Sequence, residues 1–154
     1  MHDFVKTYPN FSSIEKFLSL TDFNKNLYSI SLDIGCGEKI KNPFNANKLL
    51  GVDLIDFDNV MKHYVIANKL PFDNDYFDFC TAFDFLEHIP RTIIKNGKTY
   101  FPFIEFMGDV YRILKPKGLF LHITPAYPSK FAFQDPTHVN IITENTIPKY
   151  FCSN

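Results

Sequence analysis

The stretch "SLDIGCGEK", residues 31–39, is the feature that most constrains the fold of this chain. An apolar run ends at Gly35, and a second glycine follows after one residue. This pattern indicates a buried strand that ends in a tight turn, because glycine takes a positive φ and lets the backbone approach a ligand. Ligands of open parallel sheets bind beyond the carboxyl ends of the strands. The stretch predicts such a site; a tight turn without a ligand is the alternative.

Apolar runs and helical stretches alternate along the rest of the chain. The runs with the character of strands are Tyr28–Ile34, Leu49–Leu54, His63–Ala67, Phe77–Phe83 and Gly118–Thr124. Helical spacing of apolar residues marks residues 12–20, where Ser12 and Glu15 form a capping box, and residues 102–115. The connection 38–48 has no apolar stripe, so we expect a loop or one poor helical turn there. This order predicts an α/β fold with a mostly parallel sheet and helices on its faces.

Composition narrows the class of protein. A chain of 154 residues suits a single domain, and its net charge of -1 gives no attraction to nucleic acid or to an anionic membrane. The three cysteines are far apart and form no Cys-x-x-Cys pair, so the sequence predicts neither a metal site nor a disulfide framework. No apolar run is long enough for a membrane span, and we expect a cytoplasmic location.

Carboxylates near the glycine turn indicate the type of ligand. Asp53 ends the second strand, where a carboxylate can accept hydrogen bonds from both hydroxyls of a ribose; a solvated strand end is the alternative. A dinucleotide site needs a third glycine and a helix N-terminus, but Ile40 occupies the glycine position. Asp33 adds a negative charge where a pyrophosphate would lie, which suits an ammonium and sulfonium ligand such as S-adenosylmethionine. An NAD-dependent oxidoreductase is therefore disfavoured.

Five motifs in order resemble those of class I S-adenosylmethionine-dependent methyltransferases. "LDIGCG" and "GVDL" resemble the first two motifs, and "LPFDNDYFDFCTAFDFLEHIPR" is similar to the block that follows them. "VYRILKPKGLFLHITP" resembles the next helix, turn and strand. "QDPTHVNIITENTIPKYF" is similar to a segment of a group often associated with glycan or cell-envelope biosynthesis. The resemblance covers residues 31–151 and implies a Rossmann-like sheet with S-adenosyl-L-methionine as the cofactor.

The resemblance implies a set of cofactor-binding residues: Asp33, Gly35, Cys36, Gly37, Asp53, Leu54 and Asn68. In this family the first aspartate orients the methionine ammonium group, and the backbone of the glycine turn meets the methionyl part. The second aspartate holds the ribose hydroxyls, and the next residue packs against adenine. Many members have a carboxylate before "LPF" that binds the adenine amino group. Here that carboxylate is absent, so Asn68 or the backbone near Ala67 would take its place.

Methyl transfer to a hydroxyl benefits from a general base. The candidates are His138 in "DPTH", His88 in "LEHIP" and Asp84. His138 follows the fifth strand and is expected at the rim of the site; alternatively, "DPTH" is a loop in which Asp135 caps a turn. His88 is equally a candidate for a structural residue at a helix start. Glu87 is interpreted as a structural residue. His122, inside the fifth strand, is interpreted as a hydrogen-bonded buried histidine.

The family fold continues with a reversed strand pair, whereas this sequence stops at Asn154. We therefore expect a sheet with the C-terminal strand pair missing and with residues 118–124 as an exposed edge that could form a homo-oligomer. The chain would be a fragment, a short form that pairs with another subunit, or a remnant that binds cofactor without turnover. The predicted function is methyl transfer to a small-molecule or sugar-containing acceptor at oxygen. The alternative is a non-catalytic cofactor-binding or assembly module with this fold.

Overall fold

A five-stranded parallel sheet forms the centre of the molecule in the computed structural model, which describes residues 11–20, 28–62 and 68–152. Its strands, in spatial order, are β3 (Met61–Lys62), β2 (Lys48–Asp53), β1 (Ile30–Ile34), β4 (Phe77–Phe83) and β7 (Leu114–Ile123). Every neighbouring pair runs parallel. The predicted Rossmann-like parallel sheet is confirmed. The strand expected at residues 63–67 lies outside the described residues.

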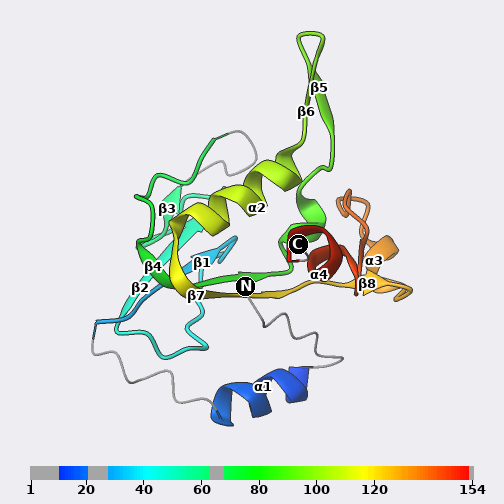
Figure 1. Ribbon diagram of the computed structural model, residues 1–154. Helices are drawn as coiled ribbons and strands as arrows, with labels where there is room; N and C mark the ends of the chain where they lie inside the picture. The colour runs from blue at the N-terminus through cyan, green and yellow to red at the C-terminus, as the bar shows by residue number, and fades with distance from the viewer. Residues whose placement is uncertain (1–10, 21–27, 63–67, 153–154) are drawn as a thin grey trace.

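The remaining elements surround this sheet. They are α1 (Phe11–Leu20), the 3-10 turn η2 (Leu86–His88), β5 (Ile93–Lys95), β6 (Lys98–Tyr100), α2 (Pro102–Ile113), β8 (Ala126–Tyr127), α3 (Phe131–Gln134), β9 (Ile142–Thr143) and α4 (Thr146–Phe151). Figure 1 shows α2 and α1 on opposite sides of the sheet, and the β5–β6 hairpin projecting away from it. The short elements β8, α3 and α4 gather beyond one end of β7 (Figure 1). None of the described helices is long and apolar enough to cross a membrane.

Two apolar clusters hold the helices against the sheet. On one side, Phe103, Val110 and Ile113 of α2 are buried with Leu32 of β1 and Ala82 of β4. The α2 residues recur every three to seven positions, so they form one stripe that removes apolar surface from water. The helix begins at Pro102, which suits a first helical turn because proline lacks an N–H group.

The cluster on the other side of the sheet is smaller. Phe44, from the connection between β1 and β2, stacks on Phe79 of β4 with ring centroids 4.4 Å apart. Leu18 of α1 packs against this pair together with Leu121 of β7. The connection 38–47 contains no helix, as its sequence predicts. A hydrophobic loop residue thus does part of the covering that a helix usually does in a parallel sheet.

Several element boundaries differ from the sequence-based expectation, and the start of β7 differs most. Strand β7 begins at Leu114, not at Gly118, and its pairing with β4 shifts between Phe77 and Phe79. The shift absorbs the "KPKG" residues as an irregularity, with Lys117 at a φ of 68°. At the other end of the chain, the predicted N-terminal helix is present as α1 (Phe11–Leu20), and the capping box of Ser12 and Glu15 stays a prediction. The contact expected from the side chain of Glu15 lies outside what is described.

Strand β7 forms one edge of the sheet in the described part of the chain, where no further strand pairs with it. Its residues are half-buried over most of its length. The edge therefore keeps unpaired backbone groups that are able to pair with another strand.

Candidate functional site

The glycine turn lies at the carboxyl end of β1 and is tied to β2 by its own N–H groups. The N–H groups of Gly35 and Cys36 donate to the carbonyl of Val52, at 2.9 and 3.3 Å. The N–H of Gly37 donates to Oδ2 of Asp53 at 2.8 Å. Three successive donors are thus engaged inside the protein. The turn can still offer carbonyl oxygens, which have two lone pairs each, so its backbone suits a cationic ligand group better than an anion.

The two glycines serve different purposes. Gly35 has a φ of +67°, and a Cβ at this position would lie 2.3 Å from Cδ2 of Phe85. Gly37 has a φ of +60°, and a Cβ there would meet nothing within 4 Å. Gly35 therefore makes room for a protein side chain. Gly37 keeps open space, which is what a ligand that approaches the backbone requires.

Asp33 lies buried beneath the turn. Its Oδ1 accepts a hydrogen bond from the hydroxyl of Thr81 at 2.7 Å, and its Oδ2 accepts one from the N–H of Lys41 at 2.7 Å. Burial raises the pKa of the Asp33 carboxyl, and the two hydrogen bonds oppose that shift. Asp33 therefore connects the loop that follows β1, through Lys41, to strand β4, through Thr81. Its expected role toward an ammonium group stays a prediction.

The thiol of Cys36 has low reactivity in this environment. Burial, followed by the negative charges of Asp33 and Asp53, raises the pKa of its thiol to about 11. The thiol donates to the carbonyl of Gly37 at 3.3 Å. Since the thiolate is the nucleophilic form, Cys36 is not equipped for nucleophilic chemistry at neutral pH. The expected contact of its backbone with the methionyl part of a cofactor stays a prediction.

The end of β2 combines a carboxylate with exposed apolar side chains. Oδ1 of Asp53 accepts a hydrogen bond from the N–H of Ile55 at 2.9 Å, so each oxygen of this carboxylate holds one backbone donor. The side chains of Leu54 and Ile55 are each 58% exposed. A carboxylate beside an uncovered apolar surface fits a ligand with hydroxyls next to a flat ring. Asn68 is exposed on the connection between β3 and β4, and its expected contact with adenine stays a prediction.

Asp84 stands at the carboxyl end of β4. Its φ is +50°, a conformation that aspartate tolerates better than most residues. Its N–H donates to the carbonyl of Ile123 at 2.8 Å, which joins the ends of β4 and β7. The residue is exposed, so its carboxylate is available to a ligand on the same sheet edge as Asp53.

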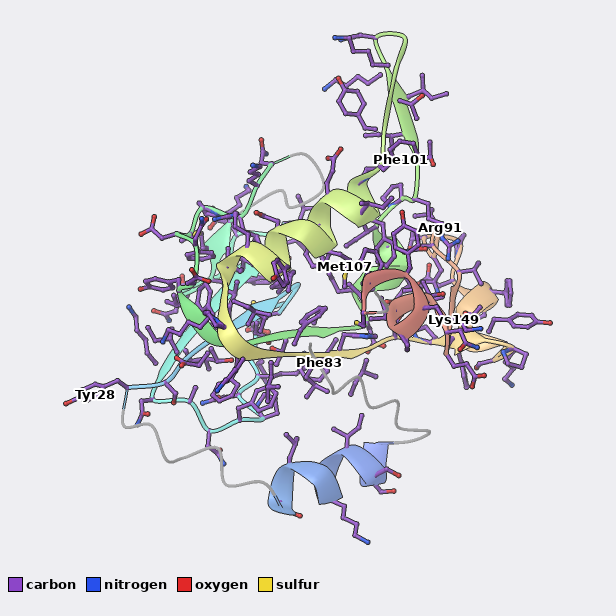
Figure 2. All side chains as sticks on the ribbon, viewed as in Figure 1. Tyr28, Phe83, Arg91, Phe101, Met107 and Lys149 are labelled. Atoms are coloured by element: carbon purple, nitrogen blue, oxygen red, sulfur yellow. The ribbon has the colours of Figure 1, made fainter. Side chains whose placement is uncertain are left out.

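The segment after β7 folds back onto the turn η2 through one asparagine. Asn140 donates its N–H to the carbonyl of Glu87 at 2.9 Å and its side-chain amide to the carbonyl of Leu86 at 3.1 Å. Arg91 donates to Oδ1 of Asn140 and to the carbonyl of Ile141, both at 2.6 Å. Figure 2 shows Arg91 beside the C-terminal elements. Neither Arg91 nor Asn140 was predicted as a site residue, because no sequence pattern indicates their contact.

This fold-back brings His88 and His138 together. Their ring centroids are 5.0 Å apart in an edge-on arrangement. Nδ1 of His88 lies 3.2 Å from the carbonyl of Thr137, and Nε2 of His138 lies 3.9 Å from Oδ2 of Asp135. Asp135 also accepts hydrogen bonds from the N–H and hydroxyl of Thr137, so it does cap a turn. Two of the three expected base candidates are thus neighbours, and their catalytic role stays a prediction.

His122 of β7 differs from its expected state. The ring packs near Phe120, with centroids 5.5 Å apart, but Nδ1 is buried and has no hydrogen-bond partner in the described chain. The interpretation as a hydrogen-bonded buried histidine is therefore wrong. Burial lowers the pKa of His122 to about 4, which keeps the ring neutral at physiological pH.

The parallel sheet, the glycine turn after β1 and the acid at the end of β2 define a Rossmann-like α/β fold. No family model and no curated protein sequence matches this chain. Solved structures do match. An S-adenosylmethionine-dependent methyltransferase from Archaeoglobus fulgidus is 20% identical, with a TM-score of 0.60, over 88% of this chain and 64% of that protein.

Two further structures show the same fold. The YcgJ protein from Bacillus subtilis is 19% identical, with a TM-score of 0.57, over 86% of this chain and 62% of that protein. The [4+2]-cyclase SpnF is 16% identical, with a TM-score of 0.56, over 85% of this chain and 51% of that protein. The chain thus spans less than two thirds of each of the three structures. At these identities the likeness establishes the fold.

Proposed function

We propose that this chain is an S-adenosylmethionine-dependent methyltransferase domain. The observation that carries the proposal is the engagement of the N–H groups of Gly35, Cys36 and Gly37 within the protein. A pyrophosphate needs such donors free at a helix N-terminus, and here the turn is followed by a loop. Two carboxylates, Asp33 and Asp53, flank the same turn. Carbonyl oxygens and carboxylates together favour the positively charged amino and sulfonium groups of S-adenosylmethionine.

The adenosine part has a matching surface at the end of β2. Each oxygen of Asp53 accepts one backbone hydrogen bond and retains a lone pair, so the carboxylate can also accept the two ribose hydroxyls. The exposed side chains of Leu54 and Ile55 then lie on the path of the adenine ring. We assign Asn68 to the adenine amino group, as the family resemblance implies.

For methyl transfer, the main task of the protein is to align the acceptor with the methyl group. S-adenosylmethionine supplies an electrophilic methyl group on its sulfonium when bound. Alignment of an acceptor can lower the barrier by about 7–11 kcal/mol, and a base adds about 10²–10⁴-fold in rate. Asp84 comes from β4, while His138 comes from the segment that folds back onto His88. We propose that these three residues face an acceptor hydroxyl on a small-molecule or sugar-containing compound.

One of the solved structures suggests a second candidate function. SpnF shares this fold and is a [4+2]-cyclase. The fold is therefore compatible with a protein that carries out other chemistry, or that binds cofactor without methyl transfer. A labelled methyl group distinguishes these possibilities. If the chain binds S-adenosylmethionine but labels no hydroxyl compound in an acceptor panel, including sugars, the binding-module alternative is favoured.

Calorimetry with three ligands tests the proposal directly. We expect S-adenosylmethionine and S-adenosylhomocysteine to bind and NAD to give no heat of binding, because the turn lacks free donors for a pyrophosphate. Titration of adenosine alone provides a control for the ribose and adenine contacts. Binding of NAD without a response to S-adenosylhomocysteine would overturn the assignment.

A further inference from the structure

Three potential metal ligands meet beside the proposed acceptor face. Glu87 and His88 come from η2, and His138 comes from the segment after β7. Each offers one ligand atom, and the three atoms lie within 4.8 Å of one another. We propose that Glu87, His88 and His138 form a binding site for a divalent transition-metal ion, with Zn²⁺ as the favoured ion. Two imidazoles and one carboxylate are a known ligand set for catalytic zinc and for other divalent transition metals.

Two buried atoms in this cluster lack partners. Glu87 is 1% exposed; its Oε2 accepts a hydrogen bond from the hydroxyl of Thr124 at 2.8 Å, whereas its Oε1 has no partner among the described residues. Nδ1 of His138 is likewise buried and has no partner in the described chain. A buried polar atom without a partner costs about 1–3 kcal/mol. One cation between these atoms would satisfy both of them.

The neighbours of each histidine leave one ring nitrogen available. Nδ1 of His88 lies 3.2 Å from the carbonyl of Thr137 and 3.1 Å from its hydroxyl. The carbonyl can only accept and the hydroxyl already donates to Asp135, so this arrangement favours a proton on Nδ1 and a free lone pair on Nε2. In His138 the carboxylate of Asp135 lies 3.9 Å from Nε2, which favours a proton there and leaves Nδ1 as the ligand atom. Metal-binding histidines commonly have such a carbonyl or carboxylate partner on the other nitrogen.

The backbone that carries the ligands is fixed, while small side-chain movements remain necessary. Asn140 bonds η2 to the segment of His138 through two hydrogen bonds, so the two parts of the cluster are held together. Ligand atoms around a tetrahedral zinc lie about 3.4 Å apart, given metal–ligand bonds of about 2.1 Å. The present separation of up to 4.8 Å therefore has to contract when an ion binds. Rotation of the partly exposed rings of His88 and His138 can supply this contraction.

Zn²⁺ with three protein ligands keeps at least one position for an outside oxygen. A hydroxyl bound there becomes more acidic. If the proposed methyl transfer is correct, this position would hold and activate the acceptor hydroxyl, so the two histidines would act through the ion and not as bases themselves. This consequence rests on the proposed function. The metal site does not, because its ligands are separate from the glycine turn and from Asp53.

Metal binding is measured first without cofactor. Protein treated with a chelator and dialysed is titrated with Zn²⁺ by calorimetry, and with Co²⁺ by visible absorption, which reports ligand geometry. We expect one ion per chain. The variants Glu87→Gln and His138→Ala should each weaken Zn²⁺ binding at least about tenfold, a typical loss for metal-site substitutions. Cys152→Ser is the matched control, because the exposed thiol of Cys152 is the alternative zinc ligand.

A second readout keeps the test decisive for variants with altered folding. Zn²⁺ should raise the melting temperature of the wild-type protein and of Cys152→Ser, but not of Glu87→Gln, which preserves the shape of the side chain. Loss of binding only in Cys152→Ser, or unchanged binding in both site variants, would overturn the proposal, as would no binding to the wild-type protein. Titration with S-adenosylhomocysteine in the presence of chelator tests cofactor binding independently of the metal ion. Its failure would overturn the methyltransferase assignment and leave the metal result standing.

Discussion

Phe85 lies directly against Gly35, so closely that a Cβ on Gly35 would be 2.3 Å from its ring. We expect Gly35→Ala to destabilise the protein by more than about 1 kcal/mol, since it adds this overlap to the strain of an alanine at positive φ. Phe85→Ala should cost less in the Gly35→Ala background than in the wild type. Urea denaturation of the four proteins in this cycle measures the coupling. Additive losses would show that the ring does not oppose a side chain at Gly35.

Gly37 allows the ligand contact to be separated from backbone strain. Gly37→Ala should weaken binding of S-adenosylhomocysteine at least about tenfold, because the new methyl group enters space that no protein atom fills. Gly97→Ala is the matched control. Gly97 has a similar φ of +71° and equally open surroundings, but it lies in the β5–β6 hairpin. Both variants should lose similar stability, and calorimetry should find weaker binding in Gly37→Ala alone. Equal affinities would remove Gly37 from the site.

Asp53→Ala should weaken binding of S-adenosylhomocysteine by about 1–3 kcal/mol, the usual loss for a charged hydrogen-bond partner. This corresponds to about 5- to 160-fold in the dissociation constant. The exposed Asp56, three residues further on, provides the control variant Asp56→Ala with the same change in charge. Calorimetry under identical salt conditions compares the two. A folded Asp53→Ala protein with unchanged affinity would contradict the proposed ribose contact.

His138→Ala should separate acceptor chemistry from cofactor binding. His138 contacts His88 and lies away from the glycine turn in sequence and in its hydrogen bonds. Affinity for S-adenosylhomocysteine should therefore change by less than about 0.5 kcal/mol. Methyl transfer to an identified acceptor should fall by about 10²-fold or more. A large loss of cofactor affinity with normal turnover at saturating cofactor would reverse this assignment.

His122 predicts a dependence of stability on pH. Its pKa is lowered to about 4 in the folded protein, from an ordinary value of 6.5, so the folded state favours the neutral ring. The corresponding stability is complete above pH 6.5 and is lost as the pH falls toward 4, at up to about 1.4 kcal/mol per pH unit. His122→Leu should flatten this part of the profile. Urea midpoints of both proteins between pH 4 and 7 give the difference, and parallel profiles would refute the claim.

The sequence predicted the parts of the fold that local patterns encode. Residues 77–83 are strand β4 as expected, because a short apolar run in a parallel sheet is buried on both faces. The start of β7 was missed because "KPKG" has the composition of a turn, and only pairing with Phe77 makes Leu114 part of the strand. Stability of that pairing is a tertiary effect that overrides local preference.

In the candidate site, too, some residues could be placed from local sequence patterns and others could not. Asp33, the glycine turn and Asp53 are close in sequence to the strand ends that position them, so their placement at one sheet edge was predictable. The meeting of His88 with His138 depends on Asn140, which contacts a turn more than 50 residues earlier. A contact of that range leaves no periodic pattern in the chain. The two histidines were therefore predictable as separate candidates, whereas their contact and a metal site between them were not.

The bonds of Asn140 to Leu86 and Glu87 can form only after residue 140 has been synthesised. Strands β1, β2 and β4 precede Asn140 in the chain, so they are synthesised before it. A nascent chain that ends before residue 135 would therefore contain the glycine turn and Asp53 but only half of the histidine pair. We expect affinity for S-adenosylhomocysteine to arise earlier during translation than the capacity to present an acceptor.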